Sequence, residues 1–522
     1  MARVFRRTAL ALLAAPPNGT YFTPVDKPTP LFFPPPPEPP LLPTPINSGL
    51  SRIATSEYHE FFIVDGHLLT IGGNRAGEMG LGHADPSAYV TPQKVLVPDG
   101  LAFVEAAAGG YQSLAVDAEG RVWTWGSNVF GQRGDGSVPD PAVIKSGKAL
   151  KEWGLPVRLT VDAEGQDFGG PADPVRQVVS VLWFDLARTA SGAVYVWGLN
   201  GDDHGGNDTR GIIGDGQPIA DDKADAARAV RRPTRVRFPA GVTIKHLAAS
   251  SCQALALDAD GRLWSWGGGG GGGMGLGVGD RGPNGNSSAP LRLKEGRAGA
   301  GAPLGPLPRF VDATTNTLTN YAIDEASDLW GWGMAGPSLG LGAANQWNPQ
   351  PYPVKLTRGG NPHFAGLDAL LAAGHRLQSV QASKNSVHVL VDDGSLWGWG
   401  DAAMGEVGDG HIVNYLKVTP RDGRNVVRCA WDWGGTKSLV QDATRILSGV
   451  RWFATSEFSF HVMAVRTDGT IHAWGRDANG VLGDRRSPYD TKGPAFQSFE
   501  PIGEVYTPNL YDAPFPLLVQ PF

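Results

Sequence analysis

The stretch that decides the fold is Val122-Trp-Thr-Trp-Gly-Ser-Asn-Val-Phe-Gly-Gln-Arg-Gly-Asp-Gly136, a short aromatic strand followed by a glycine-rich loop. The glycine that ends this strand recurs seven times in the 522 residues, at Gly72, Gly126, Gly198, Gly267, Gly333, Gly400 and Gly475. Neighbouring copies lie 54 to 75 residues apart. A repeat of this kind indicates an array of similar structural units, in which the longer copies carry loop insertions.

Each copy also predicts a β-hairpin. In the second copy the apolar segment Leu114-Ala-Val-Asp117 precedes a turn at Gly120, and the Trp-bearing strand follows. Similar apolar segments precede Gly261, Gly394 and Gly469. Strand, turn and strand of this length favour antiparallel pairing.

Tryptophan occupies alternate positions of the second hairpin strand in four copies, as in Trp123 and Trp125. A period of two places both rings on one face of a sheet, where large aromatic rings fill the gap to a neighbouring sheet. The glycines that follow suit a tight loop with positive φ. We therefore assign a structural role to the Trp-Gly pair of six copies: Trp125 and Gly126, Trp197 and Gly198, Trp266 and Gly267, Trp332 and Gly333, Trp399 and Gly400, Trp474 and Gly475.

The pattern Trp-Gly-x-Asn-x-x-Gly-Gln-x-Gly-x-Gly, preceded by Ala107-Ala-Gly109 and an apolar strand, resembles the repeat of the regulator of chromosome condensation family. The resemblance implies an all-β fold, a seven-bladed β-propeller of four-stranded blades. The second copy matches best, whereas the first has Ile71 in place of Trp and the fourth replaces the loop by glycines 267 to 273. We predict a propeller over residues 49–501, an N-terminal arm over 1–48 and a C-terminal extension over 502–522.

The N-terminal region differs in composition from the repeats. Residues 1–15 place three arginines before an apolar run, an order that fits a short signal peptide and equally a mitochondrial presequence. Residues 24–45 hold 11 prolines, which predicts an extended proline-rich arm in the polyproline II conformation. Its apolar side chains, Phe32 and Phe33 among them, favour contact with a neighbouring molecule, although an arm packed on its own propeller fits as well. A virion or extracellular location is favoured, and organelle import stays open.

The first and last copies share a second motif, because Ala54-Thr-Ser-Glu-Tyr58 returns as Ala454-Thr-Ser-Glu-Phe458. Both segments lead into an apolar strand, so we expect these two copies to lie side by side. A propeller usually closes by pairing strands from both termini, which removes free sheet edges. The segments after residue 504 either pair at this closure or wrap outward.

Catalytic patterns have little support. Gly267 to Gly273 lacks the Lys-Ser/Thr of a phosphate-binding loop, and Gly336-Pro-Ser-Leu-Gly340 matches a nucleophile elbow without a helix pattern after it. Asp202 to Asp208 collects possible cation ligands at a spacing that matches no EF-hand. The sequence therefore predicts no enzyme activity, no cofactor and no metal site.

Composition limits the partners. The net charge of −6, from 45 Lys and Arg against 51 Asp and Glu, gives no basic field, so no nucleic-acid partner is expected. Cys252 and Cys429 define no disulfide framework, and Cys252 suits a small buried position in a strand. No apolar run reaches the length of a membrane span.

The preferred hypothesis is a non-enzymatic protein-binding or structural scaffold propeller, anchored in a larger assembly by its arm, with a phage virion appendage or tail component as one version. The alternatives are a secreted or surface-located inhibitor or adhesin, and a guanine-nucleotide exchange-type regulator of a small GTPase. The family that the repeat resembles contains such exchange factors. The expected partner is another protein or further copies of the same chain.

Aromatic side chains outside the repeat strands are best placed to contact a partner, because large aromatics dominate interfaces. A competing explanation is that they pack the inserted loops. The candidates are Trp153, Trp183, Trp347, Trp431 and Trp433, together with Phe32 and Phe33 of the arm.

Overall fold

The computed structural model describes residues 49–137, 151–201, 210–217, 229–268, 274–281, 285–316, 319–333, 337–341, 348–384, 386–402, 405–409, 439–457, 459–476 and 481–482. For six further segments it gives the course of the backbone: 31–32, 411–412, 415–421, 424–430, 505–508 and 513–518.

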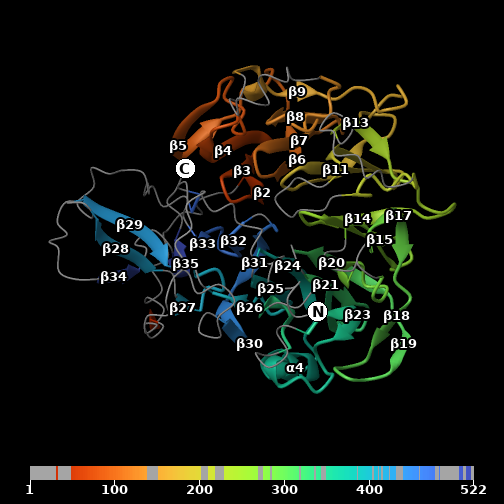
Figure 1. Ribbon diagram of the computed structural model, residues 1–522, viewed down its shortest axis with the longest axis vertical. Coiled ribbons are helices and arrows are strands. Elements are labelled where there is room, and N and C mark those ends of the chain that lie inside the picture. Colours follow the sequence, from red (N-terminus) through yellow and green to blue (C-terminus); the bar gives the residue numbers. More distant parts are fainter. Residues whose placement is uncertain are drawn as a thin grey trace.

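Seven antiparallel sheets surround a common centre, which confirms the predicted all-β propeller (Figure 1). Each blade has four consecutively paired strands. Blade one has strands β2 (Leu50–Thr55), β3 (His59–Val64), β4 (His67–Asn74) and β5 (Asp85–Lys94). Blade two has β6 (Phe103–Ala108), β7 (Gln112–Asp117), β8 (Val122–Gly126) and β9 (Val157–Arg158). Blade three has β10 (Val175–Ser180), β11 (Phe184–Thr189), β12 (Val194–Leu199) and β13 (Ala229–Arg235). Blade four has β14 (Ile244–Ala249), β15 (Gln253–Asp258), β16 (Leu263–Gly267) and β17 (Ser287–Arg292), and blade five has β20 (Phe310–Thr315), β21 (Thr319–Asp324), β22 (Leu329–Gly333) and β23 (Gln350–Lys355). Blade six has β24 (Leu377–Ala382), β25 (Ser386–Val391), β26 (Leu396–Asp401) and β30 (Leu439–Leu447). Blade seven has β31 (Val450–Ala454), β32 (His461–Arg466), β33 (Ile471–Gly475) and β35 (Ala513–Leu518).

The first strand of each blade lies nearest the centre, beside the first strands of the neighbouring blades. The ends of the strands form two faces of the disc. We call one the turn face, because it carries the turns between the first and second strands of every blade and the glycine loops. The opposite face carries the turns between the second and third strands, and we call it the hairpin face.

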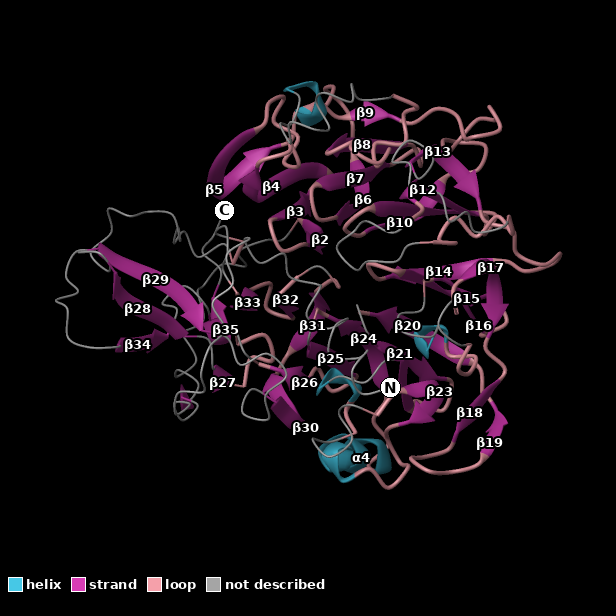
Figure 2. Ribbon diagram, viewed as in Figure 1, coloured by secondary structure: helices cyan, strands magenta, loops and turns pink. Residues whose placement is uncertain are grey.

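Helical segments are short among the described residues and lie between strands (Figure 2). They are η1 (Lys151–Gly154), η2 (Met274–Leu276), η3 (Pro337–Leu339), η4 (Pro362–Phe364) and α4 (Ala365–Ala372). The remaining strands extend blade five or form two small sheets of their own: β18 (Glu295–Arg297) and β19 (Leu304–Pro306); β1 (Leu31–Phe32) with β27 (His411–Ile412); and β28 (Tyr415–Arg421), β29 (Arg424–Ala430) and β34 (Val505–Pro508).

The core is divided among the joints between blades. Most apolar clusters draw on two adjacent blades, as where Phe61 and Ile63 of blade one pack with Trp123 and Trp125 of blade two. Both Trp of each predicted alternate pair fall in one such cluster. This confirms that the period of two turns both rings toward the same neighbour.

The repeat tryptophans also form a hydrogen bond across each of six joints. The indole Nε1 of Trp125 donates to the Glu78 carbonyl at 2.8 Å, and that carbonyl lies in the glycine loop of the preceding blade. The same bond returns at 2.7 to 3.2 Å from Trp197, Trp266, Trp332, Trp399 and Trp474. All six rings are fully buried. The assigned structural role is thus a clamp that joins each blade to the one before it.

Glycine permits this clamp. At Gly80, with φ of 71°, an added Cβ would lie 2.9 Å from the Trp125 Nε1. The strand-end Gly126, with φ of 95°, would place a Cβ 2.4 Å from the Tyr111 carbonyl. The loop glycine is therefore needed where the loop backbone passes the ring, and the strand-end glycine is needed where the strand passes the carbonyl of the neighbouring turn.

The ring closes between blades seven and one, as the repeated Ala-Thr-Ser-Glu motif predicts. The Ser456 hydroxyl donates to the Thr55 carbonyl at 2.7 Å. Strand β35 pairs with β33 as the outer strand of blade seven, so residues 513–518 of the expected C-terminal extension complete a blade. Ile71 replaces the clamp tryptophan here and packs in one apolar cluster with Leu482.

Candidate protein-docking face

Half-buried aromatic rings run across the turn face from blade one to blade three. Tyr58 and Tyr111, from the turns of blades one and two, stack with centroids 5.0 Å apart and planes 16° apart. Trp183, in the turn of blade three, meets Phe130 of the preceding glycine loop edge-on at 5.4 Å. The indole Nε1 of Trp183 has no hydrogen-bond partner among the described residues. Rings fixed in this way provide rigid apolar contact area at low entropic cost.

Charged side chains continue this row across the seam into blades seven and six. Arg476 donates to Glu57 at 2.6 Å and lies over the Phe460 ring at 5.4 Å. Lys384 covers the same ring at 5.0 Å. Arg476 and Lys384 are both partly exposed, so the row ends in two cations held by a buried aromatic ring.

The turn face is also tied across its centre. The Ser251 hydroxyl, in the turn of blade four, donates to the Glu457 carboxylate of blade seven at 2.6 Å, and both residues are buried. This bond holds the turns of blades four and seven together across the ring.

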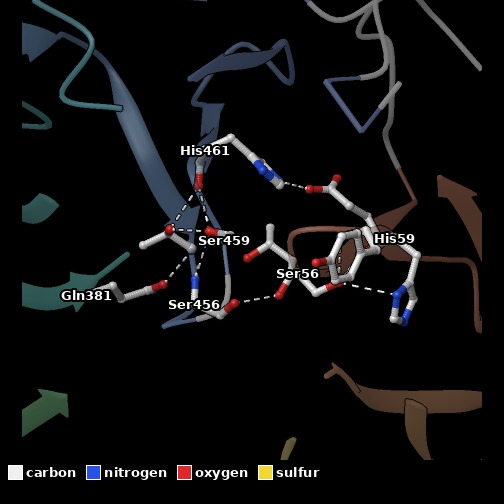
Figure 3. A network of polar contacts seen from close by, with 10 residues as sticks. Ser56, His59, Gln381, Ser456, Ser459 and His461 are labelled. Carbon is white, nitrogen blue, oxygen red and sulfur yellow. Dashed lines mark hydrogen bonds and ion pairs between the residues drawn. The ribbon is translucent and has the colours of Figure 1, made fainter. Parts of the chain in front are cut away.

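A polar network supports the face from below at the seam (Figure 3). His461 of blade seven contacts the Glu60 carboxylate of blade one, and both side chains are fully buried. Gln381 joins blades six and seven, because it donates to the Phe453 carbonyl at 2.9 Å and accepts from the Thr455 amide at 3.0 Å. The His461–Glu60 contact therefore joins blades seven and one at the joint where Ile71 cannot form the indole hydrogen bond.

Burial perturbs several ionisable groups beneath the turn face. It lowers the pKa of His59 to about 3, and the neutral ring lies between the Ser56 hydroxyl at 3.2 Å and the Ser113 hydroxyl at 2.7 Å. Burial raises the pKa of Glu78 to about 7 and that of Asp185 to about 8. Burial also raises the pKa of Glu60, against the opposing effect of His461. These side chains are enclosed, so their shifts belong to the supporting structure and do not mark an open reaction site.

The predicted contact residues have different positions. Trp183 is half-exposed on the turn face. Trp153 lies in η1 and is only 5% exposed, which fits the competing explanation that the ring packs the inserted loop. Phe32 is described by its backbone alone, and Trp347, Trp431, Trp433 and Phe33 lie outside the described residues.

Other sequence motifs find structural explanations. Ser338 belongs to the apparent nucleophile elbow, and its carbonyl accepts the hydrogen bond from the Trp399 indole. Its hydroxyl lies 3.4 Å from the Asn316 side-chain nitrogen and 3.3 Å from the Thr319 hydroxyl. Cys252 is buried, as expected. The possible cation loop Asp202 to Asp208 is outside the described residues.

Two kinds of feature are missing from the part of the chain that the structure describes. No cluster of three or more His, Cys, Asp or Glu is arranged to hold a metal ion. No helix in that part has the length and apolar character needed to cross a bilayer.

Sequence reasoning missed the Tyr58–Tyr111 stack and the Glu57–Arg476 pair. A signal for the first was present, because Tyr58, Tyr111 and Trp183 occupy the same turn position in three successive copies. Glu57 belongs to the motif shared by the first and last copies, but Arg476 follows a strand about 420 residues later, and only the closed ring brings the two together.

Comparison with known proteins agrees with this architecture. A family model described as the regulator of chromosome condensation (RCC1) repeat matches residues 65–116, and a second model of that description matches 103–132. The chain is 22% identical over 448 residues to protein pim1 of Schizosaccharomyces pombe, and this match covers 84% of the chain and 71% of pim1. It is 31% identical over 150 residues to the secretion-regulating guanine nucleotide exchange factor of Bos taurus, which covers 28% of each protein.

Two solved structures share the fold. Yeast RCC1 (Prp20), crystallised bound to Kap60, gives a TM-score of 0.58 at 18% identity and covers 97% of this chain and 90% of its own. Human WBSCR16 gives a TM-score of 0.56 at 18% identity, and the match covers 78% of this chain and 84% of WBSCR16. These likenesses do not support the phage virion version of the function, which is withdrawn.

Proposed function

Because the chain is a propeller of the regulator of chromosome condensation repeat family, we propose that it is a regulatory protein that docks a small GTPase on its turn face and promotes release of bound guanine nucleotide. The observation that carries the proposal is the continuous row on that face, from the cations at Phe460 to the rings of Tyr58, Tyr111 and Trp183.

Several features of the face support a protein partner. Its aromatic rings are half-exposed and fixed by stacking or edge-on contact, which suits anchors at an interface core. The flanking Arg476 and Lys384 suit the charged rim that steers an encounter. Two relatives support the class of partner: one is a guanine nucleotide exchange factor by name, and yeast Prp20p, whose structure is known, binds Gsp1p and histones.

The proposed activity requires no chemical step by this chain. A protein that binds the nucleotide-free GTPase more tightly than the loaded form must weaken nucleotide binding by the same factor, because the two equilibria are linked. A rigid surface serves this purpose, since it stabilises one conformation of its partner without having to reorganise. The interblade clamps and the Ser251–Glu457 bond provide such rigidity.

The test is binding of the full chain to a panel of purified small GTPases that includes Gsp1p, each prepared nucleotide-free and GDP-loaded. The proposal predicts at least one member that binds at least tenfold more tightly when nucleotide-free. Equal affinity for both forms, or no binding by any member, would contradict it and would favour a scaffold or an exported inhibitor.

A further inference from the structure

A β-bulge interrupts the first strand of every blade at the same point. In blade three Val175 pairs with Thr189 and Gln177 with Arg188, so Arg176 is the extra residue. The same shift occurs in the other six blades, near the hairpin face. All seven extra residues are exposed: Ser51, Val104, Arg176, Lys245, Val311, Gln378 and Arg451.

These residues lie on the innermost strands at the hairpin face, and we call the ring that they form the channel mouth. The first strands surround the axis, and one edge of each is paired with the second strand of its own blade. An exposed side chain on such a strand has open solvent only toward the axis or its mouth. Bulges commonly redirect a side chain in this manner.

The charge of the mouth opposes that of the whole protein. Three of its seven bulged residues are cationic and none is acidic, whereas the chain carries −6 overall. Three acidic side chains in the surrounding turns of the hairpin face are paired locally: Glu119 with Arg121, Asp260 with Arg262 and Asp392 with His375. The innermost ring of this face, formed by the seven bulged residues themselves, is therefore the part with an excess of positive charge.

Two more guanidinium groups strengthen this charge. Arg52 pairs with the buried Glu105 carboxylate at 2.5 Å. Arg188, one strand further out, is half-buried, and its Nε has no hydrogen-bond partner among the described residues. Burial and the nearby charge of Arg176 lower the Arg188 pKa, and Glu105 acts in the opposite direction. Arg52 and Arg188 therefore share the Glu105 carboxylate, and Arg176 adds a further positive charge beside Arg188.

We propose that this channel mouth is a second docking site, which binds an acidic peptide segment of a partner protein. Arg176 and Arg188 would hold its carboxylates, and Lys245 of the next blade extends the same charge. Val104 and Val311, which are 53% and 47% exposed, offer apolar contacts between the cations. Exposed apolar side chains suit a peptide with carbon-rich side chains better than a bare inorganic anion.

The test measures binding of a fluorescent peptide of eight glutamates and two leucines to the full chain by anisotropy. Arg176→Gln should weaken binding by about tenfold, as expected for loss of a charge-assisted contact, and binding should fall as salt rises. Arg292→Gln is the matched control, because Arg292 is exposed on the outer strand β17 and its substitution changes the net charge equally. Arg176 is exposed, so its substitution should leave the unfolding midpoint unchanged.

The proposal would be overturned by the absence of peptide binding, by equal binding of wild type and Arg176→Gln, or by an equal loss of binding in Arg292→Gln. A parallel titration with tripolyphosphate distinguishes a site for small anions from a site for peptides. Binding of tripolyphosphate as tight as that of the peptide would contradict a peptide site. None of these outcomes depends on the GTPase assay, since the two sites lie on opposite faces.

Discussion

The indole Nε1 of Trp266, in blade four, donates a 2.7 Å hydrogen bond to the carbonyl of Ile212 in blade three. Ile212 belongs to the glycine loop of its own blade, so the bond fastens the loop of one repeat unit to the strand of the next. The same hydrogen bond joins neighbouring blades at six joints of the disc. At the seventh joint, between blades seven and one, the buried His461–Glu60 contact joins the blades instead.

Substitution of Gly214 tests the clamp. Gly214 has φ of 67°, and an added Cβ would lie 2.9 Å from the Trp266 Nε1 and 2.8 Å from Val236. Gly216 is the control, because its φ of 76° is similar but nothing lies within 4 Å of an added Cβ. Gly214→Ala should lower the free energy of unfolding in urea by about 1 to 3 kcal/mol more than Gly216→Ala. Equal losses would mean that the close approach to the ring does not matter.

The seam should be the weakest joint once its buried pair is broken. Glu60→Ala leaves His461 enclosed without this partner and should cost about 3 kcal/mol. Glu164→Ala removes the exposed ion pair with Arg237 and should cost less than about 1 kcal/mol. Hydrogen exchange in Glu60→Ala should accelerate first in β2 and β31. Uniform acceleration in all blades would show that the seam does not open separately.

Asp185 predicts how stability depends on pH. In the folded protein burial raises its pKa to about 8, whereas its ordinary value is 3.8. Between these values the folded state binds more protons than the unfolded state, so this residue makes stability fall as the pH rises from about 4 to about 8. Asp185→Asn should show a smaller loss of unfolding free energy than wild type over that range. Parallel curves for the two proteins would contradict the buried, protonated state of Asp185.

The sequence predicted the blades well because the strand pattern is local. Alternating Trp, a turn glycine and the strand-end glycine all fall within about 25 residues, so each copy reports its own hairpin. The partner of each indole was not predictable, since the Glu78 carbonyl is 47 residues from Trp125 and is reached only after blades stack. The bulge at Arg176 left no composition signal either, because the seven extra residues share exposure and not residue type.

The candidate site was predicted only in part, for the same reason. Trp183 stood out as an aromatic residue outside the repeat strand, but so did Trp153, which is buried. Local sequence does not show which inserted aromatic reaches the surface. The charged end of the row depends on Arg476 and Glu57, which meet only when the ring closes.

Trp183 should matter for binding and little for stability. Trp183→Ala removes a half-exposed anchor ring and should weaken affinity for the nucleotide-free GTPase by about tenfold or more. Tyr352→Ala, on the outer strand β23 of blade five, is the aromatic control and should bind as wild type does. Calorimetric titration of both variants gives the comparison. A similar loss in both would move the site away from the turn face.

The rate of GDP release tests the proposed function most directly. A GTPase loaded with fluorescent GDP is mixed with saturating wild-type chain and excess unlabelled GDP, and the fluorescence decay is followed. The account predicts that release accelerates well above the spontaneous rate, and that Trp183→Ala at the same concentration accelerates it less. Release at the spontaneous rate from a GTPase that the chain demonstrably binds would contradict the exchange function and leave a binding scaffold.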